Sequence, residues 1–216
     1  MTLRKLAMPI LVAILIITCL AHGQQASAQS SDQSIQASRK DAETNLDTHL
    51  YLIVGTNQEV SQEKLPAVLD PVIRQMRSAL PFKHYKVSAT LINRVKNEGR
   101  LNLKWIGGPL LGSAADSART PSFNEFRVNQ VKLMIDGEGR QVVRLEGFGF
   151  GARIPIQSGT AIASNGPAAP IIHYENTGLN TDISLRENEP VIVGTLNVGP
   201  SGDAIILVMS VKKTAH

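Results

Sequence analysis

The sequence predicts an α+β fold, in which an antiparallel β-sheet of several hairpins carries one amphipathic helix on a face. Two observations lead to this prediction. Most segments after residue 80 alternate apolar with polar side chains and are separated by short turns rich in Gly, Asn and Asp. Residues 65–80 instead repeat their apolar side chains at intervals of three and four. Because successive strands are close in sequence, we expect them to pair antiparallel.

The N-terminal region has the organisation of a cleavable signal peptide. Arg4 and Lys5 precede a 16-residue apolar run, and small residues follow at Ala26–Ala28. A transmembrane helix needs about 20 apolar residues, so cleavage is favoured over an uncleaved anchor. We expect cleavage after Ala28, which makes residues 1–28 a signal peptide and the chain an exported protein, periplasmic or secreted.

Cleavage would also remove the single cysteine, Cys19. The remaining 188 residues are enough for one domain with a core of its own. A mature chain without thiols cannot use a disulfide, a thiolate metal site or a cysteine nucleophile. Its 20 basic and 18 acidic residues give a net charge of +2, which argues against a general attraction to polyanions.

Composition divides the mature chain into two parts. Residues 29–45 are rich in Ser, Gln, Ala and charge, and Ile35 is their one large apolar residue. Such a segment buries too little apolar surface to offset its ordering entropy, so we expect a disordered spacer. Residues 46–216 form the single globular domain. It begins with an apolar strand over His49–Gly55, which we expect to be buried on both faces.

One segment has the pattern of a helix. Its apolar side chains share one helical face: Leu65, Val68, Leu69, Val72, Ile73, Met76 and Leu80. Ser61 is the candidate N-cap, and Pro81 ends the segment. Pro71 has no N–H and crowds the preceding turn. The segment is therefore either one kinked helix or two short helices, of which the second begins at Asp70–Pro71.

The rest of the domain reads as strands and turns. We expect one hairpin from residues 83–95 and 101–105, and a second from residues 126–135 and 141–150. Loops rich in Gly, Ala, Ser or Pro are expected at 107–121 and 157–170. The last strands are 181–185, 191–196 and 204–209, and the final two are apolar enough for central positions in a sheet.

Residues Ser184–Gly194 (SLRENEPVIVG) resemble a local pattern of bacterial secretins. There a strand, a short polar turn and a Val-Ile-Val-Gly strand form a β-hairpin of the outer-membrane ring. The opening order of strand, helix and strands is also similar to the small periplasmic domains of such secretion proteins. The chain as a whole resembles exported bacterial proteins of unassigned function. Because it is far too short for the ring-forming domain, the resemblance implies a non-catalytic envelope role and no pore.

The candidate partner-binding residues are five cations of the first hairpin. Strand alternation predicts that they share one face: Lys86, Arg94, Lys96, Arg100 and Lys104. Such a face could hold an acidic protein patch, an acidic glycan or an anionic headgroup. The alternative interpretation is a solvated face whose charges discourage pairing between sheet edges. Export argues against nucleic acid as the partner.

Other motifs carry no chemistry. Gly147–Gly151 (GFGFG) is not followed by a helix start, so it does not fit a dinucleotide loop. In a strand its glycines would allow close packing on one face while the two Phe side chains fill the other. The histidines lack metal-ligand spacing, and no Gly-x-Ser-x-Gly occurs. The sequence therefore assigns no catalytic, metal-binding or cofactor-binding residue and predicts no cofactor.

These observations favour a non-catalytic exported domain that binds another cell-envelope component, with a protein as the first candidate. Two alternatives stay open. A small-ligand or glycan-binding module could use the loops at 107–121 and 157–170. A hydrolase built on two carboxylates would need no local motif.

Overall fold

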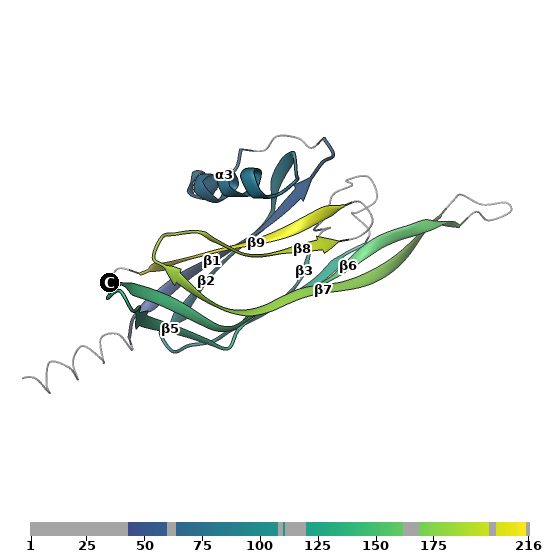
Figure 1. Cartoon of the computed structure of the whole chain (residues 1–216). Coiled ribbons are helices and arrows are strands. Elements are labelled where there is room, and N and C mark those ends of the chain that lie inside the picture. Colours follow the sequence, from purple (N-terminus) through teal and green to yellow (C-terminus); the bar gives the residue numbers. More distant parts are fainter. Residues whose placement is uncertain are drawn as a thin grey trace, which may run out of the picture. The chain divides into compact units, whose positions relative to one another are not determined.

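The computed structural model describes residues 43–59, 64–107, 110, 120–161, 169–198 and 202–214 (Figure 1). The chain divides into Met1–Glu43 and a compact unit, Thr44–His216, which contains two facing antiparallel sheets. Sheet A has the order β2 (His84–Lys96), β1 (Asn45–Thr56), β9 (Asp203–Lys213) and β8 (Val191–Val198). Sheet B has the order β3 (Leu101–Gly107), β4 (Ser122–Val128), β6 (Gln141–Ala161) and β7 (Ala169–Arg186). Its fifth strand, β5 (Gln130–Ile135), pairs with the first residues of β6, and β4 pairs with later residues of β6.

The predicted α+β class is confirmed, with antiparallel strands and, in the described part of the chain, a single α-helix. The division of the strands into two sheets was not predicted. It follows from two crossovers, β2 to β3 and β7 to β8, at which the chain leaves one sheet and enters the other. Alternation identifies the inward-facing side chains of a strand, but it does not identify the neighbouring strand.

The helix lies on the outer face of sheet A (Figure 1). A 3₁₀ turn, η1 (Ala67–Leu69), leads into α3 (Asp70–Ala79), and Pro71 stands in the first turn of α3. Proline is tolerated there because the first N–H groups of a helix have no intrahelical partner. The structure therefore decides for the short helix that begins at Asp70. The predicted cap Ser61 lies outside the described residues.

Two apolar clusters hold the domain together. The larger lies between the sheets, and the smaller lies between sheet A and α3. Strands β1 and β9 contribute to both, because Leu52 and Leu207 face sheet B while Ile53 and Ile206 face α3. This two-sided burial explains their unbroken apolar runs, and it confirms both predictions for His49–Gly55 and residues 204–209.

Strand β8 departs from the prediction. The apolar run at 191–196 was expected to be central, but β8 is the edge strand of sheet A. Its Val191 and Val193 pack partly on the inter-sheet core and Ile192 packs on the helix-side cluster, and all three are half-buried. β8 therefore carries apolar side chains on both faces although it is an edge strand, because one face packs on the inter-sheet core and the other on the helix-side cluster.

The first predicted hairpin is wrong. Both segments are strands as expected, but β2 pairs with β1 and β3 pairs with β4. The connecting turn is fastened to sheet B, since the N–H of Glu98 donates to Val131 O at 2.7 Å and the N–H of Val131 donates to Gly99 O at 2.9 Å. Both strands supply side chains to the same core from opposite sheets.

A β-bulge at Ser88 reverses the alternation within β2. Leu52 pairs with Ala89 whereas Ile53 pairs with Val87, so Ser88 has no position opposite it on β1. The odd-numbered residues before the bulge, such as Val87, pack beneath α3. The odd-numbered residues after it, such as Ala89, pack on the inter-sheet core. The Ser88 hydroxyl donates to Leu110 O at 3.2 Å.

The second predicted hairpin is confirmed by β5 and β6. Its turn is held by Asp136, whose Oδ1 accepts the N–H groups of Glu138 and Arg140 at 2.9 and 2.8 Å. The loop predicted at 157–170 is partly wrong, because β6 and β7 stay paired as far as Ala161 and Ala169. Figure 1 shows these two strands running on past the ends of β3 and β4 as a two-stranded arm.

The segment that resembles secretins spans the second crossover. Its first strand ends β7 in sheet B, and its second strand is β8 in sheet A. The turn between them is attached to β9, since Asn188 N–H donates to Val211 O at 2.8 Å and Lys213 N–H donates to Glu187 Oε1 at 3.0 Å. The two strands therefore do not form the paired hairpin that the resemblance implied.

Candidate functional site

The candidate site lies on the outer face of sheet B, and strand register builds it. Three consecutive rows of paired residues cross β3, β4, β6 and β7: Lys104–Glu125–Gly151–Gly178, Trp105–Asn124–Ala152–Thr177 and Ile106–Phe123–Arg153–Asn176. Because side chains alternate along a strand, the middle row points into the core while the other two point outward. Trp105 confirms this direction, because its ring packs against the inter-sheet core, 6.5 Å from the Phe150 ring.

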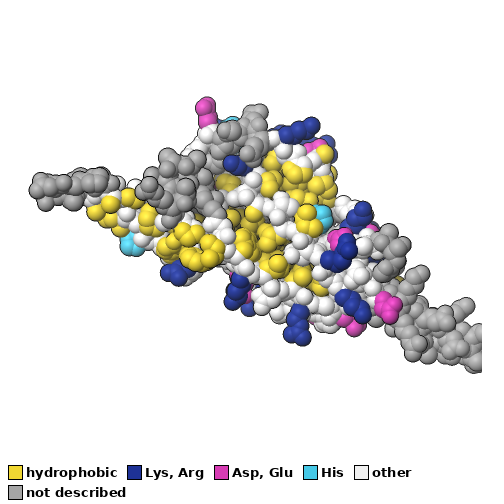
Figure 2. Space-filling model, turned by 180° about the vertical axis from the view of Figure 1, so that it is seen from behind, with side chains coloured by type: hydrophobic (Ala, Val, Ile, Leu, Met, Phe, Trp, Pro, Cys, Tyr) yellow, Lys and Arg dark blue, Asp and Glu magenta, His cyan; other side chains and the backbone are white. Residues whose placement is uncertain are grey.

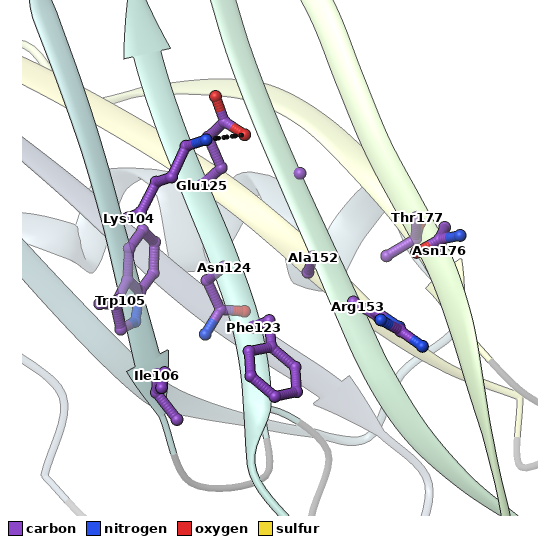
Figure 3. A pocket seen from close by; sticks show the side chains of 11 residues that line it. Lys104, Trp105, Ile106, Phe123, Asn124, Glu125, Ala152, Arg153, Asn176 and Thr177 are labelled. Carbon is purple, nitrogen blue, oxygen red and sulfur yellow. Dashed lines mark ion pairs between the residues drawn. The ribbon is translucent and has the colours of Figure 1, made fainter.

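A depression of about 520 Å³ opens over these rows (Figure 3). Gly151 forms its floor, because a Cβ built there would have no atom within 4 Å. The adjacent residue of the same row, Gly178, also lacks a side chain. The bare backbone at this point lowers the surface below the neighbouring rows, and the resulting hollow is shallow and open to solvent.

The wall on the third row is apolar and exposed. Ile106 is 70% exposed and Phe123 is 42% exposed. The Phe123 ring lies 5.9 Å from that of Tyr174, whose hydroxyl donates to Pro121 O at 3.2 Å. The Arg153 guanidinium lies 5.0 Å from the centre of the Tyr174 ring, a cation–π contact that orients the guanidinium at the rim.

Hydrophobic side chains reach the surface elsewhere too. Viewed from the side opposite to Figure 1, they gather in the middle of that face, with Lys and Arg side chains around them (Figure 2). The large apolar side chains that are exposed are Val68, Ile92, Ile106, Phe123, Met134, Ile135 and Ile171. Scattered exposed apolar residues are ordinary in proteins. Ile106 and Phe123 differ from them because they are paired across β3 and β4 and both line the hollow.

The outer face of sheet B is basic. Its strand positions carry six cations, Lys104, Arg127, Lys132, Arg144, Arg153 and Arg186, and three acids, Glu125, Glu146 and Asp182. Lys104 and Glu125 form an exposed ion pair at 3.7 Å, which contributes little to stability. The face therefore presents an excess of three positive charges to a partner.

The five cations predicted from sequence do not share one face. Arg94 and Lys96 lie on the outer face of sheet A, and the bulge at Ser88 turns Lys86 to the opposite face. Arg100 lies in the crossover, and Lys104 alone belongs to the depression. The hairpin geometry behind that prediction is wrong because β2 and β3 join different sheets. A role for these residues in binding a partner stays a prediction.

Arg94 forms an ion pair with Asp47 of the same chain. Its Nε and Nη2 donate to the two carboxylate oxygens of Asp47 at 2.7 and 3.1 Å. This bidentate hydrogen bond lowers the pKa of Asp47 below its ordinary value and raises that of Arg94. Arg94 is therefore less available to an outside anion than its exposure suggests.

Sequence reasoning missed the other cations of sheet B: Arg127, Lys132, Arg144, Arg153 and Arg186. A signal for three of them was present in the second hairpin. Alternation with a one-residue break at Asn129 puts Arg127 and Lys132 on the outward side, and pairing across the turn adds Arg144. Arg153 and Arg186 required knowledge of the β6–β7 pairing, which joins Arg153 to Asn176 and Val142 to Arg186, residues 23 and 44 apart in sequence.

The described residues also include a second hollow, but neither a metal-ligand cluster nor a helix that could span a membrane. A second hollow of about 450 Å³ lies at the other end of sheet B, between Met134, Arg144 and Arg186. No three His, Cys, Asp or Glu side chains among the described residues come together as a metal site. Within that same part of the chain, no helix has the length and apolarity to cross a bilayer. Most of the predicted binding loop 107–121 lies outside the described residues.

The motif Gly147–Gly151 has the packing role that its sequence indicated. Phe148 and Phe150 are buried in the inter-sheet core, and the Phe148 ring lies 5.4 Å from that of Phe126. On the other face, a Cβ at Gly149 would lie 2.7 Å from Arg127 Nε. The close approach is therefore made by a side chain rather than by a helix.

Comparison with known proteins gives a weak similarity to secretins. No family model and no curated protein matches the chain. The secretin InvG of the Salmonella SPI-1 type III secretion injectisome (residues 176 to the end, open gate) is 9% identical, with 90% of this chain and 67% of that chain covered and a TM-score of 0.36. The InvG secretin-domain β-barrel from the same injectisome is 10% identical, with 87% and 68% covered and a TM-score of 0.32.

The chain thus resembles secretin structures, as its sequence indicated, and the resemblance is weak. TM-scores this low carry no argument about function.

Proposed function

We propose that this chain is a non-catalytic exported domain that binds another protein of the cell envelope through the outer face of sheet B. The observation that carries the proposal is the hollow over Gly151, which combines an exposed apolar wall with a basic surround. Protein-binding surfaces use such features, because a partner side chain anchors in a hollow while charges around it steer and orient the complex.

The shape of the hollow favours a protein over a small ligand. Small-molecule sites enclose most of the ligand surface. The hollow over Gly151 lies on the face of a sheet and is open to solvent, so it can cover only one side of a small molecule. A partner protein covers the remaining side itself and can place a single apolar side chain against Ile106 and Phe123.

Export is part of the proposal and rests on the N-terminal sequence. The charged start, the apolar run and the small residues before residue 29 indicate a signal peptide. The envelope role agrees with the implication of the secretin-like segment. An N-terminal sequence of the purified mature protein that starts at Gln29 would support export, whereas a start at Met1 would contradict it.

The binding surface can be tested by filling the hollow. Gly151→Val adds a side chain where a Cβ meets no other atom, and Val suits a strand. Gly159→Val is a matched control on the same strand, because its Cβ would make an ordinary contact of 3.7 Å with Ile171 Cδ1. Both variants should fold.

In cells treated with a cross-linker, we expect the wild type and Gly159→Val to give the same heavier adduct and Gly151→Val to lose it. Retention of the adduct by folded Gly151→Val would contradict the proposed surface. Circular dichroism and the midpoint of thermal unfolding establish that each variant is folded.

A further inference from the structure

We infer that the partner presents an acidic, extended segment whose carboxylates bind Arg127 and Arg153 and whose apolar side chain enters the hollow over Gly151. This inference rests on the proposed function and names the chemistry of its partner. Its first support is charge. Each of the three acids on this face is already engaged by a neighbour within the chain, whereas Arg127 and Arg153 have no acidic partner among the described residues.

The engaged acids have definite partners. Glu125 pairs with Lys104 at 3.7 Å, and Glu146 lies between Lys132 and Arg144 at 3.4 and 3.5 Å. The carboxylate of Asp182 accepts the N–H of Gly147 at 2.6 Å. Cations therefore offset the charges of Glu125 and Glu146, and a backbone hydrogen bond holds Asp182 at Gly147.

Arg127 and Arg153 are held in place without being neutralised. Arg127 donates from Nη2 to Asn180 Oδ1 at 3.1 Å, and Arg153 stacks over Tyr174. No carboxylate of the described residues lies within 4.0 Å of either guanidinium. A guanidinium has five N–H donors, so each keeps donors for a bidentate carboxylate contact.

The two arginines stand at the two ends of a bare strip of backbone. The Arg127 side chain crosses β6 at Gly149, and Arg153 belongs to β6 itself, with Gly151 midway between them. Gly149 and Arg153 are four residues apart on β6, which corresponds to about 13 Å along the strand. An extended segment aligned with β6 therefore matches this spacing with acids at positions i and i+4, and its residue i+2 points to the same side and reaches Gly151.

The apolar wall favours a peptide over a membrane or a glycan. Residue i+2 of the segment would lie beside Ile106 and Phe123, which offer contact to an apolar side chain. A planar anionic membrane would meet the rim of the hollow and leave its floor empty, and an acidic glycan has no large apolar group for this wall. Both serve as competing outcomes in the test.

The probe is a fluorescently labelled peptide, Thr-Glu-Thr-Phe-Thr-Glu-Thr, titrated with the mature chain and followed by fluorescence anisotropy. Its matched forms carry Gln or Lys in place of both Glu, or Ala in place of Phe. We expect the Glu peptide to bind, the Gln and Ala forms to bind roughly tenfold more weakly, and the Lys form not to bind. Added salt should weaken binding of the Glu peptide.

Charge exchange makes the test specific. Arg127→Glu and Arg153→Glu should each weaken binding of the Glu peptide by roughly tenfold, and the double variant should gain affinity for the Lys peptide. Arg74→Glu is the control, because Arg74 is an exposed residue of α3 on the outer side of sheet A, and it should leave both affinities unchanged.

Equal binding of the Glu and Gln peptides would overturn the inference. So would an absence of peptide binding together with Arg127-dependent binding to phosphatidylglycerol vesicles or to polygalacturonate. The proposed function fails separately. If the cellular adduct is lost in Gly151→Val but is unchanged in the double arginine variant, the binding surface stands and the acidic partner does not.

Discussion

The side chain of Arg127 lies directly over Gly149, so a Cβ at Gly149 would fall 2.7 Å from Arg127 Nε and 2.9 Å from Arg127 Cγ. The same Cβ would lie 2.7 Å from Asn180 Oδ1, the atom that accepts the Arg127 hydrogen bond. The absence of a side chain at Gly149 is therefore what allows a residue of β4 to place its charge over β6.

Gly149→Ala should displace Arg127 from its position over β6. We expect the variant to fold with a loss of about 1–3 kcal/mol in the free energy of unfolding, as is typical of overpacking. Its affinity for the acidic peptide should fall as far as that of Arg127→Ala. Urea unfolding and the peptide titration measure the two effects. Gly159→Ala is the control, and equal peptide binding by wild type and Gly149→Ala would contradict the role of this contact.

Gly147 in sheet B should tolerate substitution poorly. Its φ is +61°, and a Cβ there would lie 2.2 Å from Asn129 Nδ2. The left-handed backbone alone costs a non-glycine residue about 1–2 kcal/mol, and the displaced Asn129 adds to that. We expect Gly147→Ala to lower the free energy of unfolding by about 2–3 kcal/mol. Gly137→Ala, in open space with no positive φ, should change it by less than about 0.5 kcal/mol.

The bulge at Ser88 can be tested by removing one residue. Deletion of Ser88 would make Val87 and Ala89 neighbours that still pair with Ile53 and Leu52, so Tyr85 and Val87 should stay beneath α3. The deletion and Ser88→Ala both lose the hydrogen bond to Leu110 O, so each should lower the free energy of unfolding by about 1 kcal/mol. Urea unfolding compares the two variants. A loss of about 3–5 kcal/mol on deletion alone, as expected from exposure of Tyr85 and Val87, would contradict this account of the bulge.

Stability should fall at acid pH through Asp47. The bidentate hydrogen bond from Arg94 lowers the pKa of Asp47 below 3.8, so the folded state binds a proton less readily than the unfolded chain. This contribution is fully present above the unfolded pKa and is lost as pH falls through the lower folded pKa. Asp136 acts in the same direction, because it accepts backbone N–H groups from Arg140 and Glu138.

Asp47→Asn should therefore flatten the acid limb of the stability curve between pH 5 and pH 2 relative to wild type. Thermal unfolding midpoints measured across this range provide the comparison. Both side chains of the pair are partly exposed, which keeps the effect small. A wild-type and a variant curve that run parallel down to pH 2 would contradict the role of the pair.

Local pattern was sufficient to predict most of the individual elements. The three- and four-residue spacing located α3. Pro71 indicated either a kink or a helix start, and the structure shows a helix that starts at Asp70. The two-residue period located β2 and β3, the turn at Asp136–Gly139 located β5 and β6, and unbroken apolar runs located β1 and β9. These features depend on the side chains of a single segment, so they can be read without knowing what lies opposite.

Pairing between distant segments could not be predicted in the same way. Turn chemistry at Asn97–Gly99 is the same whether the chain reverses within a sheet or crosses to another. The position of the bulge at Ser88 depends on the register with β1, more than 30 residues earlier. The five cations predicted to share a face are separated for this reason, and the basic face observed on sheet B draws its cations from five strands.

Site-specific photocross-linking in cells that produce the protein tests directly whether the outer face of sheet B binds a partner. A photoreactive amino acid replaces Ile106, at the hollow of sheet B, or Ile92, on the outer face of sheet A, whose side chains are 70% and 65% exposed. We predict a discrete adduct from position 106 that disappears when Gly151→Val is added, and none from position 92. An adduct from position 92 alone, or one from position 106 that persists in Gly151→Val, would contradict the claim that this face binds the partner.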